Sequence, residues 1–441
     1  MALPRNNYRD KKTNCQMKHF PLILILASCL SGYAVTLEEC RQMAKENFPV
    51  TKSYAILDKT EKYTLETASK AWLPQVQVGA QASWQNHVPA YPDAFSKIIE
   101  SQGMTVEGMR KDQYRISADV RQIIWDGGRI SAEKDIARAR VDESRRSNDV
   151  QIYALYERVD EVFFAIILLT EQEKAVDASI ELLEANVKTL NACYKNGAAM
   201  ESDVDAVKVQ LLEAQRQKAN IAATADSFKK VLALYIGMET CPSLDMPAEA
   251  EENIFGKRPE YALFEAQQAS LLAEEKAVQK SLMPSLSFFG STFYGYPGMN
   301  SMDAMLNHKW KWNLMVGASI TWNISAFYSK SSKINNLRAK SEYVNNQREL
   351  FDYNQRLLTS SQSDEIKRLE IIAQNDDEIV NLRSKVRKAE EAKLREGIIN
   401  PTDLLLKITE ERNARILQAT HKIDILKAKY KLNHTLGHEE L

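Results

Sequence analysis

The chain has 441 residues and a formal net charge of −1, with 44% hydrophobic and 27% charged residues. This balance is ordinary for a globular protein and excludes little, since the length suits either several domains or one elongated body. The charge does argue against nucleic-acid binding, because the basic residues are spread along the chain rather than clustered on one segment.

The N-terminus has the features of an export signal. A short basic region at Met17 precedes an apolar stretch that is too short to span a bilayer, and Gly32-Tyr33-Ala34 has the small residues of a cleavage site. We therefore expect residues 1–34 to be a signal peptide, with residues 1–16 as an extension upstream of the true start.

The position of Cys29 leaves open an alternative way of processing the signal peptide. Leu26-Ala-Ser-Cys29 also fits a lipoprotein signal, in which Cys29 would become the acylated first residue. Ordinary cleavage would instead leave three widely spaced cysteines, Cys40, Cys193 and Cys241. Such an odd number supports neither a disulfide framework nor a metal cluster.

The remaining chain is a tandem duplication. Gly197 lies six residues before Asp203, and Gly397 lies six residues before Asp403, at a shift of 200 positions. Two prolines 25 residues apart recur at a shift of 210 positions, as Pro49 and Pro74 and then as Pro259 and Pro284. Two copies of one unit predict an internally pseudo-symmetric fold. The predicted units are a first repeat at 35–240, a linker at 241–256 and a second repeat at 257–441.

Each repeat is expected to begin with a short helix, over 36–71 and over 259–282, and to continue with two strands. The strands follow from a change to alternating apolar and polar residues, at about 74–86, 113–125, 284–295 and 310–323. Each has the length and the two-faced alternation of a transmembrane β-strand. Five of the six tryptophans lie in or at the ends of these segments, as an interfacial aromatic girdle requires: Trp84, Trp125, Trp310, Trp312 and Trp322.

A long helix should follow each pair of strands. Residues 127–193 contain no proline and no glycine after Gly128, and residues 327–393 contain neither; both stretches are 67 residues long. A continuous helix of that length is roughly 100 Å long. A glycine-containing turn and a return helix then complete two helical hairpins, at 127–237 and 327–437.

The first return helix has the seam of a coiled coil, because apolar residues recur every three or four positions from Val204 to Tyr235, with only Lys218 breaking the series. Four strands are too few to close a barrel, for which about eight are needed. Open sheet edges are not stable in hydrocarbon, so membrane insertion would require several chains. Two soluble hairpins packed on a helical core remain the alternative.

Further motifs occur in order along the chain: Thr36-Leu-Glu-Glu-Cys-Arg-Gln-Met-Ala, Ala71-Trp-Leu-Pro-Gln-Val, Ile124-Trp-Asp-Gly-Gly-Arg and the two Gly-to-Asp turns. With the duplicated order of elements, they resemble the TolC-type outer-membrane efflux protein family over essentially the whole mature chain. The resemblance implies a mainly α fold with a small transmembrane β part. It also implies a homotrimer in which twelve strands, four per chain, form one β-barrel that continues into a periplasmic α-helical barrel.

The same resemblance implies a function and a location. The chain would be an outer-membrane channel with a long periplasmic extension, the passive exit duct of a tripartite system for small-molecule or drug efflux. Its partners would be a periplasmic adaptor (membrane fusion) protein, an inner-membrane RND-type or ABC transporter, and outer-membrane lipid. Type I protein secretion is a second function for such a duct. A periplasmic coiled-coil scaffold that never inserts is an alternative of a different class.

Asp203 and Asp403 are candidate gate residues. An acidic residue early in a helix complements the helix dipole, at ~0.3–1 kcal/mol, whereas the family resemblance implies that the two aspartates ring a closed periplasmic entrance. Family members with a well-defined gate have a tyrosine three residues before the second turn glycine and an arginine two after it; here these are Leu394 and Ile399. A constriction by Ile398 and Ile399 is therefore an alternative.

Gly197 and Gly397 are expected to form the tip turns, which commonly need positive φ. No catalytic constellation is recognisable: Asp126-Gly127-Gly128-Arg129 lacks the context of a dinucleotide-binding motif. His434 and His438 have helical spacing but are expected to lie on a frayed C-terminus. We therefore expect neither enzymatic activity nor a cofactor or metal.

Overall fold

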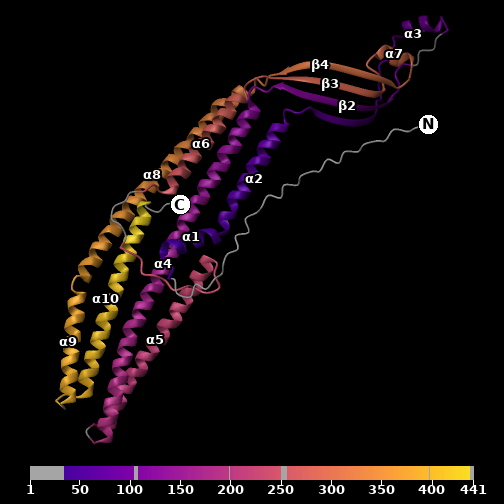
Figure 1. The fold of residues 1–441 in the computed structure, drawn as a ribbon. Coiled ribbons are helices and arrows are strands. Elements are labelled where there is room, and N and C mark those ends of the chain that lie inside the picture. Colours follow the sequence, from indigo (N-terminus) through magenta and orange to yellow (C-terminus); the bar gives the residue numbers. More distant parts are fainter. Residues whose placement is uncertain (1–33, 104–107, 198, 250–255, 397, 438–441) are drawn as a thin grey trace, which may run out of the picture.

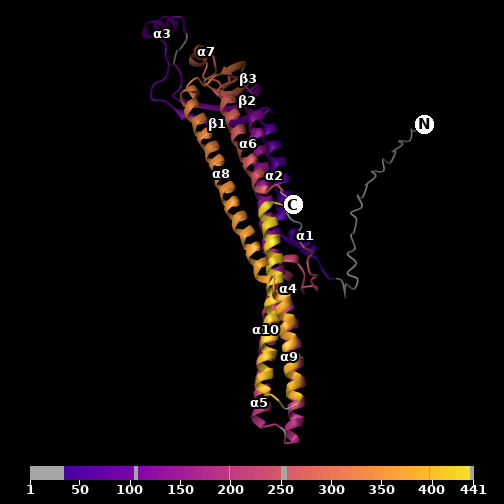
Figure 2. The ribbon, with the colours of Figure 1, turned by 90° about the vertical axis from the view of Figure 1, so that its left-hand side faces the viewer.

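The protein is a long rod with a β-sheet at one end and two helical hairpins at the other (Figure 1). The computed structural model describes residues 34–103, 108–197, 199–249, 256–396 and 398–437. The predicted signal peptide, except for its last residue, and Cys29 lie outside these ranges. A view turned by 90° shows that the hairpins and the sheet lie at opposite ends of the same body (Figure 2).

The two repeats share one order of elements, apart from an extra helix at the start of the first and a divided long helix in the second. The first consists of α1 (Leu37–Asn47), α2 (Pro49–Lys70), β1 (Gln75–Trp84), α3 (Asp93–Glu100), β2 (Asp112–Trp125), α4 (Arg129–Lys195) and α5 (Glu201–Ile236). The second consists of α6 (Pro259–Lys280), β3 (Ser285–Tyr296), α7 (Ser301–Leu306), β4 (Lys311–Thr321), α8 (Ala326–Ala373), α9 (Asp376–Arg395) and α10 (Pro401–Leu436). The strands lie close to the ranges expected from the alternating residues.

Corresponding helices match in length. Helices α2 and α6 each have 22 residues and begin with a proline, and α5 and α10 each have 36 residues. Both return helices end at a left-handed glycine, Gly237 and Gly437, with φ of 73° and 79°. A Cβ at Gly237 would come within 2.8 Å of the Asn47 side chain, and a Cβ at Gly437 would come within 2.8 Å of the Arg258 backbone nitrogen. Each return helix therefore ends against the segment that leads into the short helix of its own repeat.

The first short helix differs from the prediction of one element over 36–71. It is interrupted at Phe48, whose φ and ψ of −68° and 126° are extended, and α2 restarts with Pro49. Proline lacks the N–H of a continuing helix and disfavours helical geometry in the residue before it. The break therefore follows from Pro49, and it separates α1 from α2.

The second long helix also differs from the prediction. Helix α4 is continuous over 67 residues, but the corresponding stretch is broken at Gln374 and Asn375 into α8 and α9. Asn375 has φ of −107° and ψ of 4°. No glycine or proline is responsible. Asparagine is a weak helix former, and three consecutive acidic residues, 376–378, favour a new helix N-terminus directly after it.

The sheet joins the two repeats. Its order is β1-β2-β3-β4, every neighbouring pair is antiparallel, and β2 pairs with β3 across the repeat boundary. One row of the register runs through Val76, Val120, Gly290 and Val316, and the next row runs through Gln77, Asp119, Ser291 and Met315. Successive rows point to opposite faces, so the sheet has one apolar and one largely polar face.

The main hydrophobic core lies midway along the rod, where α1, α4, α5 and α10 meet. Its fully buried side chains include Leu37, Phe163 and Leu232. An ion pair with two hydrogen bonds lies beside it: Arg41 Nε and Nη2 donate to the Asp160 carboxylate at 2.8 and 2.5 Å. These contacts fix the first helix of the chain against the long helix α4.

His434 corrects the expectation of a frayed C-terminus. Its side chain is buried, and its ring stacks on Tyr153 with centroids 4.2 Å apart. Its carbonyl oxygen accepts hydrogen bonds from Tyr153 Oη at 2.6 Å and Arg258 Nη1 at 3.2 Å. His438 lies outside the described residues. The end of α10 is thus packed into the middle of the rod.

Candidate functional site

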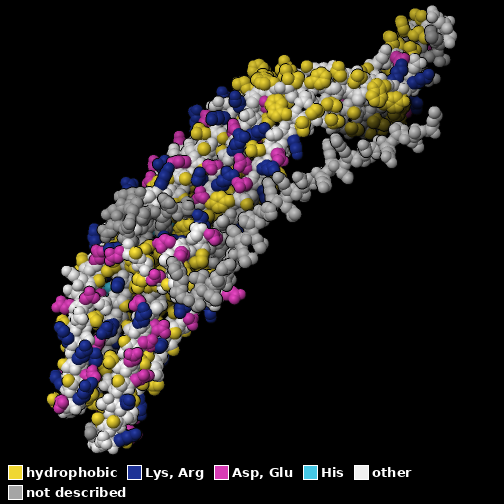
Figure 3. All heavy atoms as spheres, in the orientation of Figure 1, with side chains coloured by type: hydrophobic (Ala, Val, Ile, Leu, Met, Phe, Trp, Pro, Cys, Tyr) yellow, Lys and Arg dark blue, Asp and Glu magenta, His cyan; other side chains and the backbone are white. Residues whose placement is uncertain are grey.

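The apolar face of the sheet is an extended hydrophobic surface that is exposed in this chain. Val78, Trp312 and Ile320 are each more than 70% exposed. Hydrophobic side chains gather over the strands, whereas charged side chains are spread along the helices (Figure 3). A contiguous apolar surface of this kind marks contact with a membrane or with another protein.

The five predicted girdle tryptophans all lie at the ends of strands, and all are exposed. Trp84, Trp310 and Trp312 lie at the loop end of the sheet, and Trp125 and Trp322 lie at the end next to the helices. The indole nitrogen of Trp322 donates to the Leu282 carbonyl oxygen at 2.9 Å. Aromatic residues at both ends of an apolar band are typical of transmembrane strands.

The sheet has two edges without partners among the described residues. β1 and β4 each pair with one neighbour only. The backbone N–H and C=O groups along the outer sides of these strands therefore need partners if the sheet is to enter hydrocarbon. A four-stranded sheet of this kind can form one part of a β-barrel, but it cannot close a barrel by itself.

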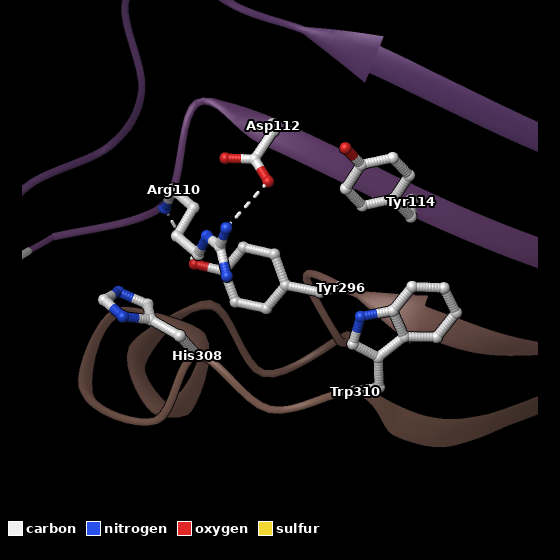
Figure 4. Close-up of a pocket in the computed structure, with 6 residues that line it drawn as sticks. All are labelled: Arg110, Asp112, Tyr114, Tyr296, His308 and Trp310. Atoms are coloured by element: carbon white, nitrogen blue, oxygen red, sulfur yellow. Dashed lines mark hydrogen bonds and ion pairs between the residues drawn. The ribbon is translucent and has the colours of Figure 1, made fainter.

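Loops from both repeats meet at the outer end of the sheet (Figure 4). The Tyr296 hydroxyl accepts a hydrogen bond from the Arg110 backbone N–H and donates one to the Ala304 carbonyl oxygen, both at 2.9 Å. His308 Nε2 lies 2.6 Å from the Gly108 carbonyl oxygen. Sequence reasoning did not find this cluster, because its members are separated by almost 200 residues and share no motif.

The Asp-Gly-Gly-Arg segment connects β2 to α4. The buried Asp126 carboxylate accepts hydrogen bonds from the backbone N–H groups of Gly128, at 2.8 Å, and Ile130, at 2.6 Å. Gly127 has φ of 71°, and a Cβ there would lie 2.4 Å from the Met283 Cβ. This motif therefore caps the long helix and packs against the second repeat, a role that sequence reasoning missed.

The predicted gate residues lie at the hairpin end of the rod. Asp203 caps α5, because its carboxylate accepts the Met200 backbone N–H at 3.0 Å. Asp403 lies in the first turn of α10. Apolar residues from α4, α5 and α10 form one cluster at this end, which brings the two helix starts together: Leu183, Leu190, Val204, Val207, Ala214, Leu404, Leu405 and Ile408.

The other predicted residues at the tips differ in packing and in exposure. Gly197 has the expected positive φ, 76°, and nothing lies within 4 Å of the position that a Cβ would occupy. Ile399 packs with Leu394 against the apolar cluster, whereas Ile398 is 71% exposed. Gly397 lies outside the described residues. Asp203 thus has a capping role, and a gate of either kind stays a prediction.

A buried ion pair connects α9 to α10. Glu411, which is 3% exposed, accepts hydrogen bonds from Arg387 and from Arg415, the latter at 2.8 Å. Burial alone would raise the pKa of Glu411, but the hydrogen bonds from Arg415 and Arg387 lower it below the usual value. The carboxylate is therefore charged at neutral pH.

No group of three or more potential metal ligands occurs among the described residues. Cys40, Cys193 and Cys241 are free thiols, and burial raises the pKa of Cys40 to about 12. Within the described ranges, no helix combines the length and the apolar character needed to cross a bilayer.

Comparisons with known proteins agree with this geometry. The family model described as "Outer membrane efflux protein" matches residues 43–237. The outer-membrane channel OprN superposes with a TM-score of 0.66 at 15% identity, covering 91% of this chain and 90% of that chain. The outer membrane protein VceC from Vibrio cholerae gives 0.65 at 12% identity, with 91% and 96% covered.

The CmeC outer membrane channel from Campylobacter jejuni has a TM-score of 0.64 at 13% identity, and covers 99% of this chain and 93% of that chain. None of the curated proteins compared with the chain matches it. The solved structures share the mainly helical fold with a small antiparallel sheet over both repeats. Residues 43–237 therefore match the outer membrane efflux protein family, and the chain over both repeats has the fold of TolC-type outer-membrane channels.

Proposed function

We propose that the protein is a trimeric, passive exit duct for small molecules, which leave the periplasm through a helical tunnel and cross the outer membrane through a shared β-barrel. In this arrangement, β4 of each copy pairs with β1 of the next. Each chain contributes four strands, so three chains exceed the roughly eight strands that a closed barrel needs.

The observation that carries the proposal is the sheet. It combines an exposed apolar face, a polar face, tryptophans at both ends and two edges that have no partner strand in the described part of the chain. An isolated sheet with these features would expose both apolar surface and unpaired backbone groups. Closure by identical copies in a bilayer satisfies the edges and covers the apolar face with lipid.

The length of the helices is the evidence for the periplasmic half of the proposed duct. Helix α4 alone, with 67 residues, is roughly 100 Å long, so the hairpin tips lie far from the sheet. The tips are the part that an adaptor protein would reach, and an inner-membrane transporter of the RND or ABC type would supply the energy. The duct itself has no catalytic role. The family description favours efflux as the transport mode.

Planar-bilayer recording of the full chain purified in detergent tests the proposal. We expect long-lived conductance steps and heat-modifiable migration of the purified protein on gels. Recovery of the protein in the osmotic-shock fraction, with no conductance after addition to bilayers, would instead favour a periplasmic scaffold and contradict the duct.

Asp203 and Asp403 form the gate in this proposal, as a ring of carboxylates at the periplasmic entrance. Replacing both by asparagine keeps an oxygen that can cap α5, but removes the charge. We expect higher conductance at low salt or weaker block by divalent cations. Unchanged single-channel traces would leave Asp203 with its capping role alone.

A further inference from the structure

The polar face of the sheet has an unequal distribution of charge. Four charged residues lie in the strands on this face: Arg115, Asp119, Arg121 and Lys311. Lys311 forms an ion pair with Asp303 of α7, so its charge is compensated. Each chain therefore presents two arginines and one aspartate that have no such partner among the described residues.

The guanidinium group of Arg115 is held against the sheet by an aromatic ring. The Arg115 guanidinium carbon lies 4.1 Å from the centroid of the Phe293 ring, a cation–π contact with a largely buried partner. Arg121 is in register with Phe289. The two arginines are six positions apart on β2, which corresponds to ~20 Å along an antiparallel strand. The two arginines therefore lie at two different positions along the length of the strands.

Asp119 does not neutralise either arginine directly. Its carboxylate accepts a hydrogen bond from the Ser291 hydroxyl at 2.5 Å, and no ion pair joins it to Arg115 or Arg121 among the described residues. A groove beside it is lined by further groups that can donate hydrogen bonds to an anion, including Gln75, Gln77 and Ser291. The cationic and donor groups thus outnumber the carboxylate on this face.

This face cannot be the lipid-facing one at low cost. An arginine at the middle of the bilayer on the lipid side of a strand costs about 2–4 kcal/mol. The same side chain on the other face would line an aqueous lumen and stay hydrated. Identical copies around that lumen would preserve the ratio of two arginines to one aspartate, whatever their number.

We infer that Arg115 and Arg121 make the β-barrel end of the duct an anion-favouring filter, which passes small anionic solutes such as carboxylates and chloride more readily than cations of similar size. The inference rests on the proposed duct, because it requires the polar face to line the lumen. Rings of arginine or lysine select anions in pores by the field that they produce. The barrel end would then oppose the cation preference of the carboxylates at the periplasmic end.

The test is the reversal potential of the full-length protein in planar bilayers under a potassium chloride gradient. The Asp203→Asn and Asp403→Asn background removes the two proposed gate carboxylates at the tip, so that the sheet contributes more strongly to selectivity. We expect a chloride-to-potassium permeability ratio above one. Arg115→Gln with Arg121→Gln should lower this ratio by roughly threefold or more, and Asp119→Asn should raise it.

Salt and a matched charge change provide the controls. The anion preference should be largest at about 0.01 M salt, where the Debye length is ~30 Å, and should nearly vanish at about 1 M. Lys59→Gln, at an exposed position of α2, should leave the ratio unchanged.

The possible results distinguish a failure of the proposed filter from a failure of the proposed duct. A conducting background protein with a ratio of one or below, or a ratio that neither the arginine pair nor Asp119 alters, would overturn the filter and leave the duct intact. The single Asp119→Asn and Arg121→Gln variants give the same decision if the double arginine variant does not assemble. A complete lack of conductance from the background protein would overturn the duct, and the filter with it.

Discussion

The two helical hairpins at the end of the rod have return helices of equal length but are held together by different interactions. Helices α4 and α5 meet along a seam of fully buried leucine, valine and alanine side chains. In α9, by contrast, only two residues are buried within the described chain, Val380 and Arg387, and Arg387 forms an ion pair with Glu411 of α10. Helix α9 packs mainly on α10, after the break that separates it from α8.

This difference has an energetic consequence. Apolar contacts depend little on salt or pH, whereas ion pairs depend on both the charge state and the presence of each partner. The first hairpin should therefore be uniformly stable, and the second should be stable only while its buried charges are matched. Hydrogen exchange of the two hairpins in one sample can measure this contrast directly.

Removing one buried charge should have the largest effect. Arg387→Ala leaves the Glu411 carboxylate buried with Arg415 as its remaining partner, and loss of a buried ion-pair partner costs about 3–5 kcal/mol. We expect much faster exchange in α9 and unchanged exchange in α5. Lys393→Ala is the matched control on the same helix, because its pair with Glu390 is at the surface and should contribute less than about 1 kcal/mol. Equal effects of the two variants would contradict the contrast.

Truncation in the apolar seam should have a similar or somewhat smaller effect on the other hairpin. Leu183 is 2% exposed, and Leu→Ala substitutions in cores cost about 2–5 kcal/mol. Leu183→Ala should accelerate exchange in α4 and α5 by the same factor at low and at high salt. A strong salt dependence of this variant would show that the seam is not the main source of stability.

Acid should loosen the second hairpin selectively. Since the pKa of Glu411 is lowered in the folded protein, its contribution is fully present above the unfolded value of about 4.5 and is lost as the pH falls through the lower folded value. Exchange in α9, corrected for the intrinsic rate, should therefore increase as the pH falls below about 4.5. Glu411→Gln should be less stable at pH 7 but should lose this acid dependence. The same acid response in α4 and α5 would contradict the assignment.

The smallest effect is expected at the helix break. Asn375→Ala replaces a weak helix former by the strongest one, which favours a continuous α8–α9 helix by less than about 1 kcal/mol. We expect slightly greater helicity by circular dichroism and slower exchange around residue 375. Faster exchange there would mean that the break is required by packing.

The parts of the fold that local patterns determine were predictable. The strands follow from alternating residues such as Val76, Gln77 and Val78, and the uninterrupted α4 follows from the lack of proline and internal glycine. The two helix breaks were harder to predict from the sequence. Pro49 carries a recognisable signal that was not used, whereas Asn375 breaks a helix through weak propensity and an acidic stretch whose effect depends on context.

Contacts between distant residues could not be predicted from one sequence. Arg41 and Asp160 are 119 positions apart, and Tyr153 and His434 are 281 positions apart. Each pair depends on how α1 or α10 packs on α4, which periodicity does not specify. The same limit applies to the tips, where the sequence identified Asp203 but did not reveal that its carboxylate caps its own helix.

Cryo-electron microscopy of the full chain purified in detergent tests the central claim most directly, because it shows how the edges of β1 and β4 are satisfied. We predict threefold-symmetric particles with a detergent belt around the sheets, and with β4 of each copy paired to β1 of its neighbour. A monomeric particle without a detergent belt, in which both edges remain unpaired, would contradict the account.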